Sequence, residues 1–108
     1  MDRDVRKANN ESLFREVNER VEDTAIKWGA AENGIAFICE CSDLECTTRV
    51  ELTLPQYEHV RTEAAQFVVA PGHMDPTIEV VTETFPSYEI VTKHGQAAAR
   101  AEADDPRS

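Results

Sequence analysis

The three cysteines of this 108-residue chain, Cys39, Cys41 and Cys46, lie close together in the sequence. Cys39 and Cys41 end an apolar segment of strand-like composition, and residues two apart on a strand present their side chains to the same face. A Ser-Asp pair at 42–43 suits a turn that brings Cys46 back toward them. The spacing therefore allows all three sulfur atoms to converge on one metal ion.

A site with three thiolates needs a fourth ligand, and the chain has three histidines that could supply it. His59 falls on a predicted helix opposite its apolar residues, and His94 follows the last predicted strand. His73 comes directly after a Pro-Gly pair at 71–72, where proline restricts the backbone and glycine permits a left-handed conformation. Such a turn can present a ligand rigidly, so His73 is the favoured ligand, with Asp43 or water as the alternative. The predicted ligand set is Cys39, Cys41, Cys46 and His73.

Three thiolates and one imidazole form a donor set that suits a tetrahedral zinc ion. The C-x-C-x4-C spacing differs from the paired C-x2-C motifs of common zinc ribbons, and the same ligand types can hold a 2Fe–2S cluster. Small iron–sulfur proteins with this ligation carry a Pro-x-Cys-Asp-Gly-x-x-x-His segment. The chain lacks that segment, so zinc is the favoured metal.

The predicted zinc site is structural rather than catalytic. A catalytic zinc keeps an open coordination position beside an acid or base, and four protein ligands leave no position open. Glu40 is a candidate base, but it lies between Cys39 and Cys41 and therefore points to the opposite face of the strand. The chain also lacks His-Glu-x-x-His, Gly-x-Ser-x-Gly and phosphate-binding glycine motifs.

The chain length and the net charge reduce the number of possible functions. A chain of this length buries a modest core, and small folds commonly need a metal, disulfides or a partner subunit for stability. The formal net charge is −10, and nearly all of the excess acid lies after residue 28. An acidic surface repels phosphate backbones, so we predict no nucleic-acid binding and an unknown protein partner with a basic surface.

An N-terminal amphipathic helix is predicted from Asn10 to Trp28. Asn10 can cap this helix, and the charge of Glu11 favours its first turn. Apolar residues recur at intervals of three and four, at Leu13, Phe14, Val17, Val21, Ala25 and Trp28. We predict that this stripe packs on the helix's own domain; an interface helix is the alternative.

The remaining pattern predicts a small antiparallel sheet beside the helix, so the predicted fold class is α+β with a zinc knuckle. An unbroken apolar strand over 34–39, predicted to be central and covered on both faces, pairs with a half-buried strand over 48–53 through the cysteine loop. Further predicted elements are a short helix over 53–61, a strand over 67–70, and a hairpin of 77–82 with 88–92. Together they define a single domain over 10–94, with a flexible arm over 1–9 and a disordered acidic tail over 95–108.

The predicted compartment is the cytoplasm. No apolar run approaches the roughly 18–20 residues of a membrane span, so we predict no membrane partner. Residues 1–7 also lack the apolar core of a signal peptide. Thiols stay reduced in the cytosol, where clustered cysteines more often bind a metal than form disulfides.

These motifs together resemble a group of short, functionally uncharacterised bacterial proteins. The matching segments are Asn10 to Arg20, the F-x-C-E-C-x4-C motif over 37–46, Tyr57 to Arg61, and Phe67 to His73 with its P-G-H end. The resemblance covers about residues 10–94. It implies a bacterial cytosolic protein with a Cys3His zinc motif, and it implies no particular activity.

The sequence therefore predicts a non-enzymatic, zinc-stabilised module for protein interaction or regulation. The N-terminal helix and the acidic surface are its predicted contact surfaces. A thiol redox switch, in which cysteine oxidation ejects zinc, is one alternative. A metalloenzyme or iron–sulfur protein that uses the Cys3His site is the other.

Overall fold

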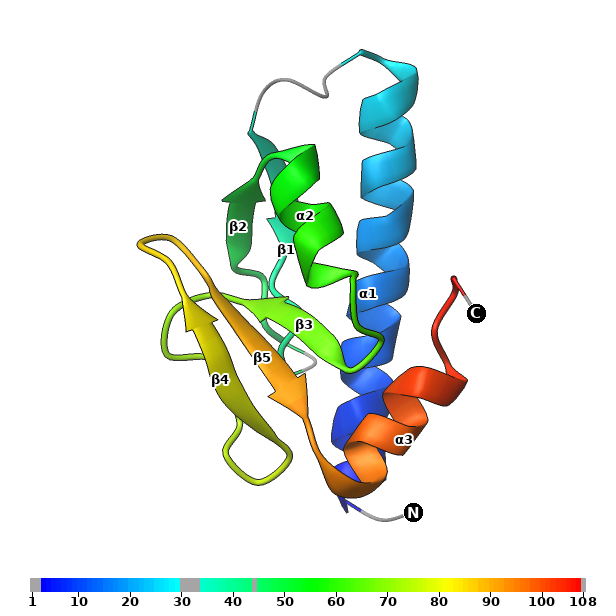
Figure 1. Ribbon diagram of the computed structural model, residues 1–108, viewed down its shortest axis with the longest axis vertical. Helices are drawn as coiled ribbons and strands as arrows, with labels where there is room; N and C mark the ends of the chain where they lie inside the picture. Colours follow the sequence, from blue (N-terminus) through cyan, green and yellow to red (C-terminus); the bar gives the residue numbers. More distant parts are fainter. Residues whose placement is uncertain (1–2, 30–33, 44, 108) are drawn as a thin grey trace.

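The computed structural model describes residues 3–29, 34–43 and 45–107. Three helices and five strands are found in these residues (Figure 1). They are α1 (Arg3–Lys27), β1 (Ile35–Ile38), β2 (Arg49–Leu52), α2 (Leu54–Val60), β3 (Gln66–Val69), β4 (Glu79–Thr84), β5 (Glu89–Lys93) and α3 (Gly95–Ala103). The long helix α1 lies along one side, with the strands and α2 beside it and α3 packed near its N-terminal end (Figure 1). The predicted α+β class is confirmed.

The strands form two small antiparallel sheets. β1 pairs with β2, with Phe37 opposite Val50, which confirms the predicted hairpin through the cysteine loop. In the second sheet β5 lies between β3 and β4. The predicted β4–β5 hairpin is confirmed, and a register shift between Val81 and Glu83 marks an irregularity in β4.

The prediction that β1 is a central strand covered on both faces is wrong. Among the described strands β1 pairs with β2 alone, and Ala36 is exposed while Ile35 and Phe37 are buried. Alanine is small and is often exposed to solvent, so Ala36 can lie on an uncovered face of β1 although it belongs to an apolar run. Beyond β1 the chain meets the second sheet, where the Glu40 amide donates to the Val68 carbonyl oxygen at 2.8 Å.

Helix α2 covers the core face of β1. Phe37 stacks on Tyr57 with ring centroids 4.4 Å apart, and both side chains are fully buried. The helix begins with a capping box, in which Thr53 accepts a hydrogen bond from the Gln56 amide and the Gln56 side chain accepts one from the Thr53 amide. These two bonds fix where the chain leaves β2 and turns into α2.

Replacing Thr53 by alanine removes one of these two bonds. We expect a loss of about 1 kcal/mol in the free energy of unfolding, because the Gln56 amide loses its acceptor at the helix N-terminus. Urea titration measures the loss. Thr48→Ala is the matched control, since Thr48 is exposed and its side chain makes no hydrogen bond among the described residues. Equal losses in the two variants would contradict the capping role.

Helix α1 packs on its own domain, as predicted, but it does so mainly through a polar face. Its buried residues are Glu11, Arg15, Asn18, Glu22 and Ala25. Of the predicted apolar stripe, Ala25 is buried and Val21 packs against the core. Much of the predicted stripe faces outward, with Leu13, Val17 and Trp28 exposed by 50%, 40% and 83%. The polar and the apolar residues of α1 both recur at intervals of three and four, and the sequence alone does not show which of the two sets meets partners in the rest of the domain.

In the described part of the chain no helix has the length and apolar character needed to cross a bilayer.

Arg15 is the central residue of this polar face. Its guanidinium lies 3.5 Å from the centroid of the Phe67 ring and donates to the carbonyl oxygens of Ala64 and Gln66. The side chain is almost completely buried, and burial lowers the pKa of Arg15 from its ordinary value. Arg15 therefore joins α1 to the turn before β3 and to β3 itself.

A buried ion pair network holds the N-terminal half of α1. Lys93 of β5 pairs with Glu11 of α1 and with Glu79 of β4, and all three side chains are fully buried. Burial raises the pKa of Glu11 to about 9, against the opposing effect of the Lys93 charge. The network connects α1 to two strands of the second sheet.

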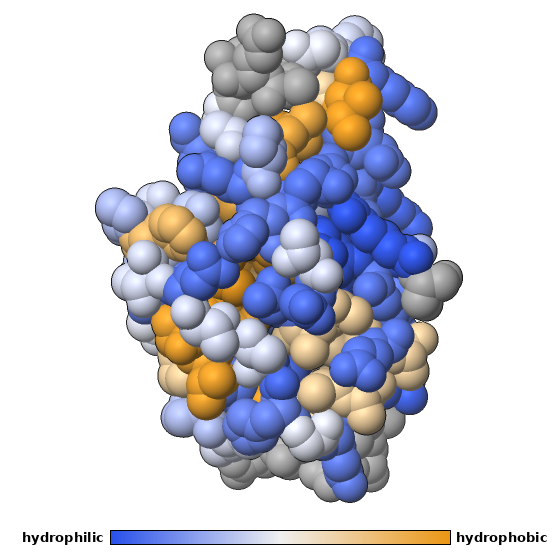
Figure 2. All heavy atoms as spheres, in the orientation of Figure 1, coloured by the Kyte–Doolittle hydropathy of each residue, from blue (hydrophilic) through white to orange (hydrophobic). Residues whose placement is uncertain are grey.

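Both chain ends are more regular than predicted. Residues 3–9 continue α1 instead of forming a flexible arm, and the predicted disordered tail contains α3. Residues 1–2 and 108 lie outside the described residues. Ala97 and Ala101 are buried and α3 packs on α1, because alanine favours helices and its small side chain permits close packing. The alanine-rich helix is the pale orange area at the lower right of Figure 2.

Candidate metal centre

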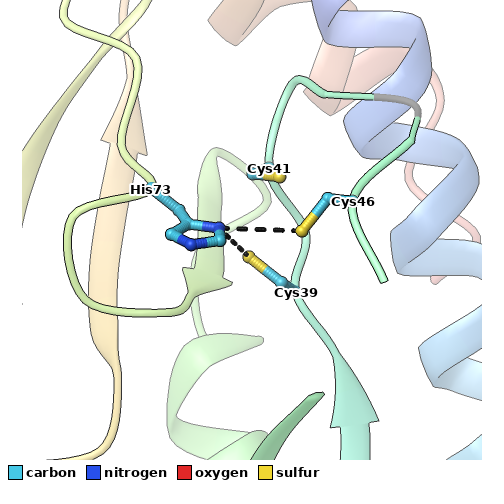
Figure 3. Close-up of side chains that lie close together, drawn as sticks. All are labelled: Cys39, Cys41, Cys46 and His73. Atoms are coloured by element: carbon cyan, nitrogen blue, oxygen red, sulfur yellow. Dashed lines mark hydrogen bonds between the residues drawn. The ribbon is translucent and has the colours of Figure 1, made fainter. Parts of the chain in front are cut away.

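The four predicted ligands come together beyond the end of β1. One ligand atom from each of Cys39, Cys41, Cys46 and His73 lies within 4.8 Å of the others. Cys39 and Cys41 follow β1, Cys46 lies on the segment that returns toward β2, and His73 reaches in from the loop between β3 and β4 (Figure 3). The two cysteines nearest β1 are buried, whereas Cys46 and His73 are partly exposed. These residues are close enough to bind a metal ion.

A tight turn presents His73. The His73 amide donates to the Ala70 carbonyl oxygen at 3.0 Å, which closes a four-residue turn. Gly72 has a φ of 83° in this turn, a conformation that favours glycine, and Pro71 precedes it. The turn follows β3 directly, so the histidine is held at the edge of the second sheet. This agrees with the expectation that the Pro-Gly pair positions the ligand.

The other two histidines lie outside the cluster. His59 of α2 is half exposed and pairs with Glu83 of β4 at 2.8 Å. His94 is exposed and immediately precedes α3. The preference for His73 over these two residues is therefore consistent with the geometry.

The spacing of the donor atoms fits a tetrahedral zinc ion. His73 Nδ1 lies 3.5 Å from the Sγ atom of Cys39 and 3.6 Å from that of Cys46 (Figure 3). Bonds of about 2.3 Å to sulfur and about 2.0–2.1 Å to nitrogen, at a tetrahedral angle, place such atoms about 3.6 Å apart. The two measured distances therefore match this coordination, and all four donor atoms lie within 4.8 Å of one another.

The polar surroundings of the cluster favour thiolate sulfur. The Ala70 amide donates to Cys39 Sγ at 3.2 Å, so one turn supplies both a hydrogen bond to a sulfur atom and the histidine ligand. The pKa of Cys41 is lowered to about 5, chiefly because the Cys39 thiol donates a hydrogen bond to it. The same interaction raises the pKa of Cys39, and burial adds to that effect. Cys41 is thus prepared to ligate a cation as a thiolate.

Glu40 anchors the segment between the two buried cysteines. Its side chain is fully buried, and its hydrogen-bond partners lie on α1 and β3 and not among the four clustered residues. Its carboxylate accepts hydrogen bonds from the Val68 amide and from Asn18 Nδ2, each at 2.9 Å. Asn18 also bonds both the amide and the carbonyl oxygen of Ile38 at 2.9 Å. Burial raises the pKa of Glu40, while the charge of Arg15 and these hydrogen bonds oppose the shift.

A second set of contacts ties the start of α1 to the same loops. Lys7 pairs with Asp75 at 2.6 Å, and the Ser42 hydroxyl donates to the same carboxylate at 3.0 Å. Although burial opposes it, hydrogen bonds from Lys7, Thr77 and Ser42 hold the pKa of Asp75 well below its usual range. Asn10, expected to cap the helix, instead lies within α1 and donates to the Ser42 carbonyl oxygen at 3.2 Å.

Sequence patterns did not indicate these supporting residues. The position of Glu40 between two cysteines suggests a candidate base, and Asn18 does not belong to the apolar stripe predicted for the helix. The available signal was a polar repeat, since Glu11, Arg15, Asn18 and Glu22 follow the same three- and four-residue spacing as the apolar stripe. A repeat of that kind is typical of an exposed face, and only the folded structure shows that it is buried.

No protein-family model, curated protein or solved structure matches this chain. The function proposed below therefore rests on the chain's own residues and their contacts.

Removing the Glu40 carboxylate tests its supporting role. In Glu40→Ala the Val68 amide and Asn18 lose a buried acceptor, so we expect the free energy of unfolding to fall by about 1–3 kcal/mol. Loss of such a supporting group typically weakens metal affinity by about 10–100-fold, which competition with a chromogenic chelator measures. Glu40→Gln is the matched control, because its amide oxygen keeps one acceptor. It should lose less stability and less metal affinity than Glu40→Ala. Equal metal affinity in all three proteins would refute the role.

Proposed function

We propose that this protein is a small module whose fold is stabilised by a structural zinc ion bound to Cys39, Cys41, Cys46 and His73. We further propose that it acts by binding other proteins and has no catalytic activity. The convergence of three thiols and one imidazole at tetrahedral spacing is the observation that carries the metal proposal. Four protein donors satisfy the coordination of zinc and leave no position for a substrate.

The position of the cluster supports a structural role. It joins the end of β1, the segment before β2 and the loop after β3, so one ion would cross-link segments from both sheets. Structural zinc sites supply on the order of 10 kcal/mol at neutral pH, and a small domain has only about 5–15 kcal/mol of net stability. Metal binding is therefore large enough to decide whether the chain folds.

The surface supports a binding role more than a catalytic one. Large apolar side chains are exposed along α1 and directly after it, at Leu13, Val17, Ile26 and Trp28. The chain carries a net charge of −10, which matches a basic protein surface and repels nucleic acid. Hydrophilic residues cover most of the face shown in Figure 2, with apolar groups scattered among them.

Elemental analysis of protein purified from its native host tests the metal proposal. We expect one zinc ion per chain and no iron or acid-labile sulfide. Stoichiometric iron with sulfide would replace this proposal by the iron–sulfur alternative. For the binding role, an affinity purification should recover a protein partner that high salt releases, and recovery of no such partner would count against it.

A thiol switch is the second candidate. Cys46 is partly exposed and its sulfur lies beside His73 Nδ1, so an oxidant can reach the cluster from solvent. In this account, oxidation of cysteine by a low dose of peroxide releases zinc, and reduction restores binding. Retention of zinc under that treatment would exclude the switch and leave the structural role.

A further inference from the structure

An acidic pocket lies where the C-terminal segment passes over α1 and α2. It is a hollow of about 400 Å³, lined by Glu19, Glu22, Asp23, Glu58, Pro106 and Arg107. The carboxylates come from the second half of α1 and from α2, and the last two residues come from the segment that follows α3. None of these residues belongs to the metal cluster.

The pocket already holds one guanidinium group. Arg107 Nε and Nη2 lie 2.6 and 3.0 Å from the two carboxylate oxygens of Glu19. Its Nη1 and Nη2 atoms donate to the two oxygens of Glu58 at 3.2 and 2.6 Å, and Nη2 also lies 3.0 Å from Glu22. Paired N–H groups facing paired carboxylate oxygens are the arrangement by which proteins recognise arginine. The carboxylates are thus placed to bind a guanidinium group.

One arginine does not neutralise the pocket. Four carboxylates line it, and Arg107 is the one cationic side chain among its lining residues. Glu22 is buried, and burial raises its pKa to about 7, with the charge and hydrogen bond of Glu58 adding to the shift. Hollow space remains beside Arg107, and the four carboxylates outnumber the two arginines that contact them, Arg107 and Arg61.

Glu19 is held by a second, buried arginine, whereas Arg107 is accessible to solvent. The side chain of Arg61 is fully buried and pairs with Glu19 at 3.1 Å, which holds that carboxylate in place from below. Arg107 is an exposed residue whose side chain remains about one-third accessible. Ion pairs that water can reach typically contribute only about 0–1 kcal/mol each. A basic segment from another protein can therefore compete with Arg107 for the same carboxylates.

We propose that this pocket receives an arginine side chain from a basic segment of a protein partner, and that Arg107 occupies the same position in the free protein. This inference deepens the proposed binding function and depends on it. The partner supplies a guanidinium group to Glu19 and Glu58 and displaces the chain's own arginine. Because a partner must displace Arg107, Arg107 lowers the affinity of the pocket for every such partner.

Peptide titration of the full-length chain tests the proposal. The probe is an acetylated, amidated Gly-Arg-Gly-Arg-Gly peptide, and its neutral counterpart carries citrulline in place of each arginine. Binding is followed by amide chemical shifts in the zinc-loaded wild-type protein and in Arg107→Gln. We expect Arg107→Gln to bind the arginine peptide about tenfold more tightly than the wild type, with shifts centred on residues 19–23 and on α2. The citrulline peptide should not bind.

Matched variants distinguish peptide binding at the pocket from nonspecific electrostatic attraction to an acidic protein. Adding Glu58→Gln to Arg107→Gln should weaken peptide binding about tenfold, whereas adding Glu63→Gln should leave it unchanged. Glu63 is an exposed acid in the turn after α2 and does not line the pocket. Equal binding by wild type and Arg107→Gln, equal losses from the two glutamate variants, or binding of the citrulline peptide would overturn the proposal.

The same experiment distinguishes this inference from the metal proposal. Zinc content and amide dispersion are measured on each variant before titration. A variant that keeps zinc and its fold but shows none of the expected changes refutes the arginine pocket and leaves the structural zinc site standing. Loss of zinc from the wild-type protein would refute the metal proposal without bearing on the pocket.

Discussion

Removing the metal at neutral pH is expected to abolish cooperative thermal unfolding and to reduce the strand signal in circular dichroism. A structural zinc ion of the kind proposed contributes on the order of 10 kcal/mol, which is comparable to the whole net stability of a small domain. The physical reason lies in the contacts around the cluster. Without the ion, the Cys39–Cys41 segment and the turn before His73 lose the link that joins both sheets.

Metal loss should also loosen α1, because its contacts to the metal-binding loops depend on their position. Asn10 and Asn18 bond the backbone of these loops, and Asn18 bonds Glu40 between the two buried cysteines. Hydrogen exchange of amides in β1, β3 and α1 should therefore accelerate together on chelation. Cys39→Ser should reproduce the effect, and the exposed Ser87→Ala should not. An unchanged thermal midpoint after verified metal removal would disprove the structural role.

Arg15→Ala is expected to destabilise the fold by about 3–5 kcal/mol, the range for removing one partner from a buried charged network. The change leaves the carbonyl oxygens of Ala64 and Gln66 without their donor and removes the guanidinium from the Phe67 ring. It also removes the positive charge that offsets the burial of Glu40. Arg15→Lys should recover only part of the loss, because an ammonium group lacks the planar fork that reaches both carbonyls.

Urea titration of Arg15→Ala and Arg20→Ala measures this effect with a matched control. The Arg20 side chain is 79% exposed, and within the described part of the chain it pairs only with Glu16, one turn earlier on α1. A surface change of that kind is expected to alter the free energy of unfolding by less than about 0.5 kcal/mol. If the two variants lose equal stability, the polar face of α1 does not hold the helix in the way proposed.

Features governed by local pattern could be predicted from the sequence. The hairpin through the cysteine loop, helix α2 and the β4–β5 hairpin follow from short apolar patterns and from proline and glycine positions. The clustering of Cys39, Cys41, Cys46 and His73 follows from similar local reasoning, because a strand end sets the direction of the first two cysteines and a Pro-Gly turn places the histidine. Such patterns act over a few residues and need no knowledge of the partner segments.

Features governed by contacts distant in sequence could not be predicted. The buried face of α1 depends on Arg15 meeting Phe67 and on Glu11 meeting Lys93, and neither partner is visible from the helix sequence. Helix α3 was missed for a related reason, since Ala97 and Ala101 bury little area alone and gain stability by packing on α1. Whether a polar or small residue is buried depends on the residues it packs against, and these lie far away in the sequence.

X-ray absorption at the zinc edge of the purified native protein tests the central claim most directly. The proposed zinc site predicts three sulfur atoms at about 2.3 Å and one nitrogen atom at about 2.0–2.1 Å, with no oxygen bound to the ion. His73→Ala should replace the nitrogen signal by water oxygen and leave three sulfur atoms. A site with fewer than three sulfur atoms, or with bound oxygen in the wild-type protein, would contradict a closed structural centre at Cys39, Cys41, Cys46 and His73.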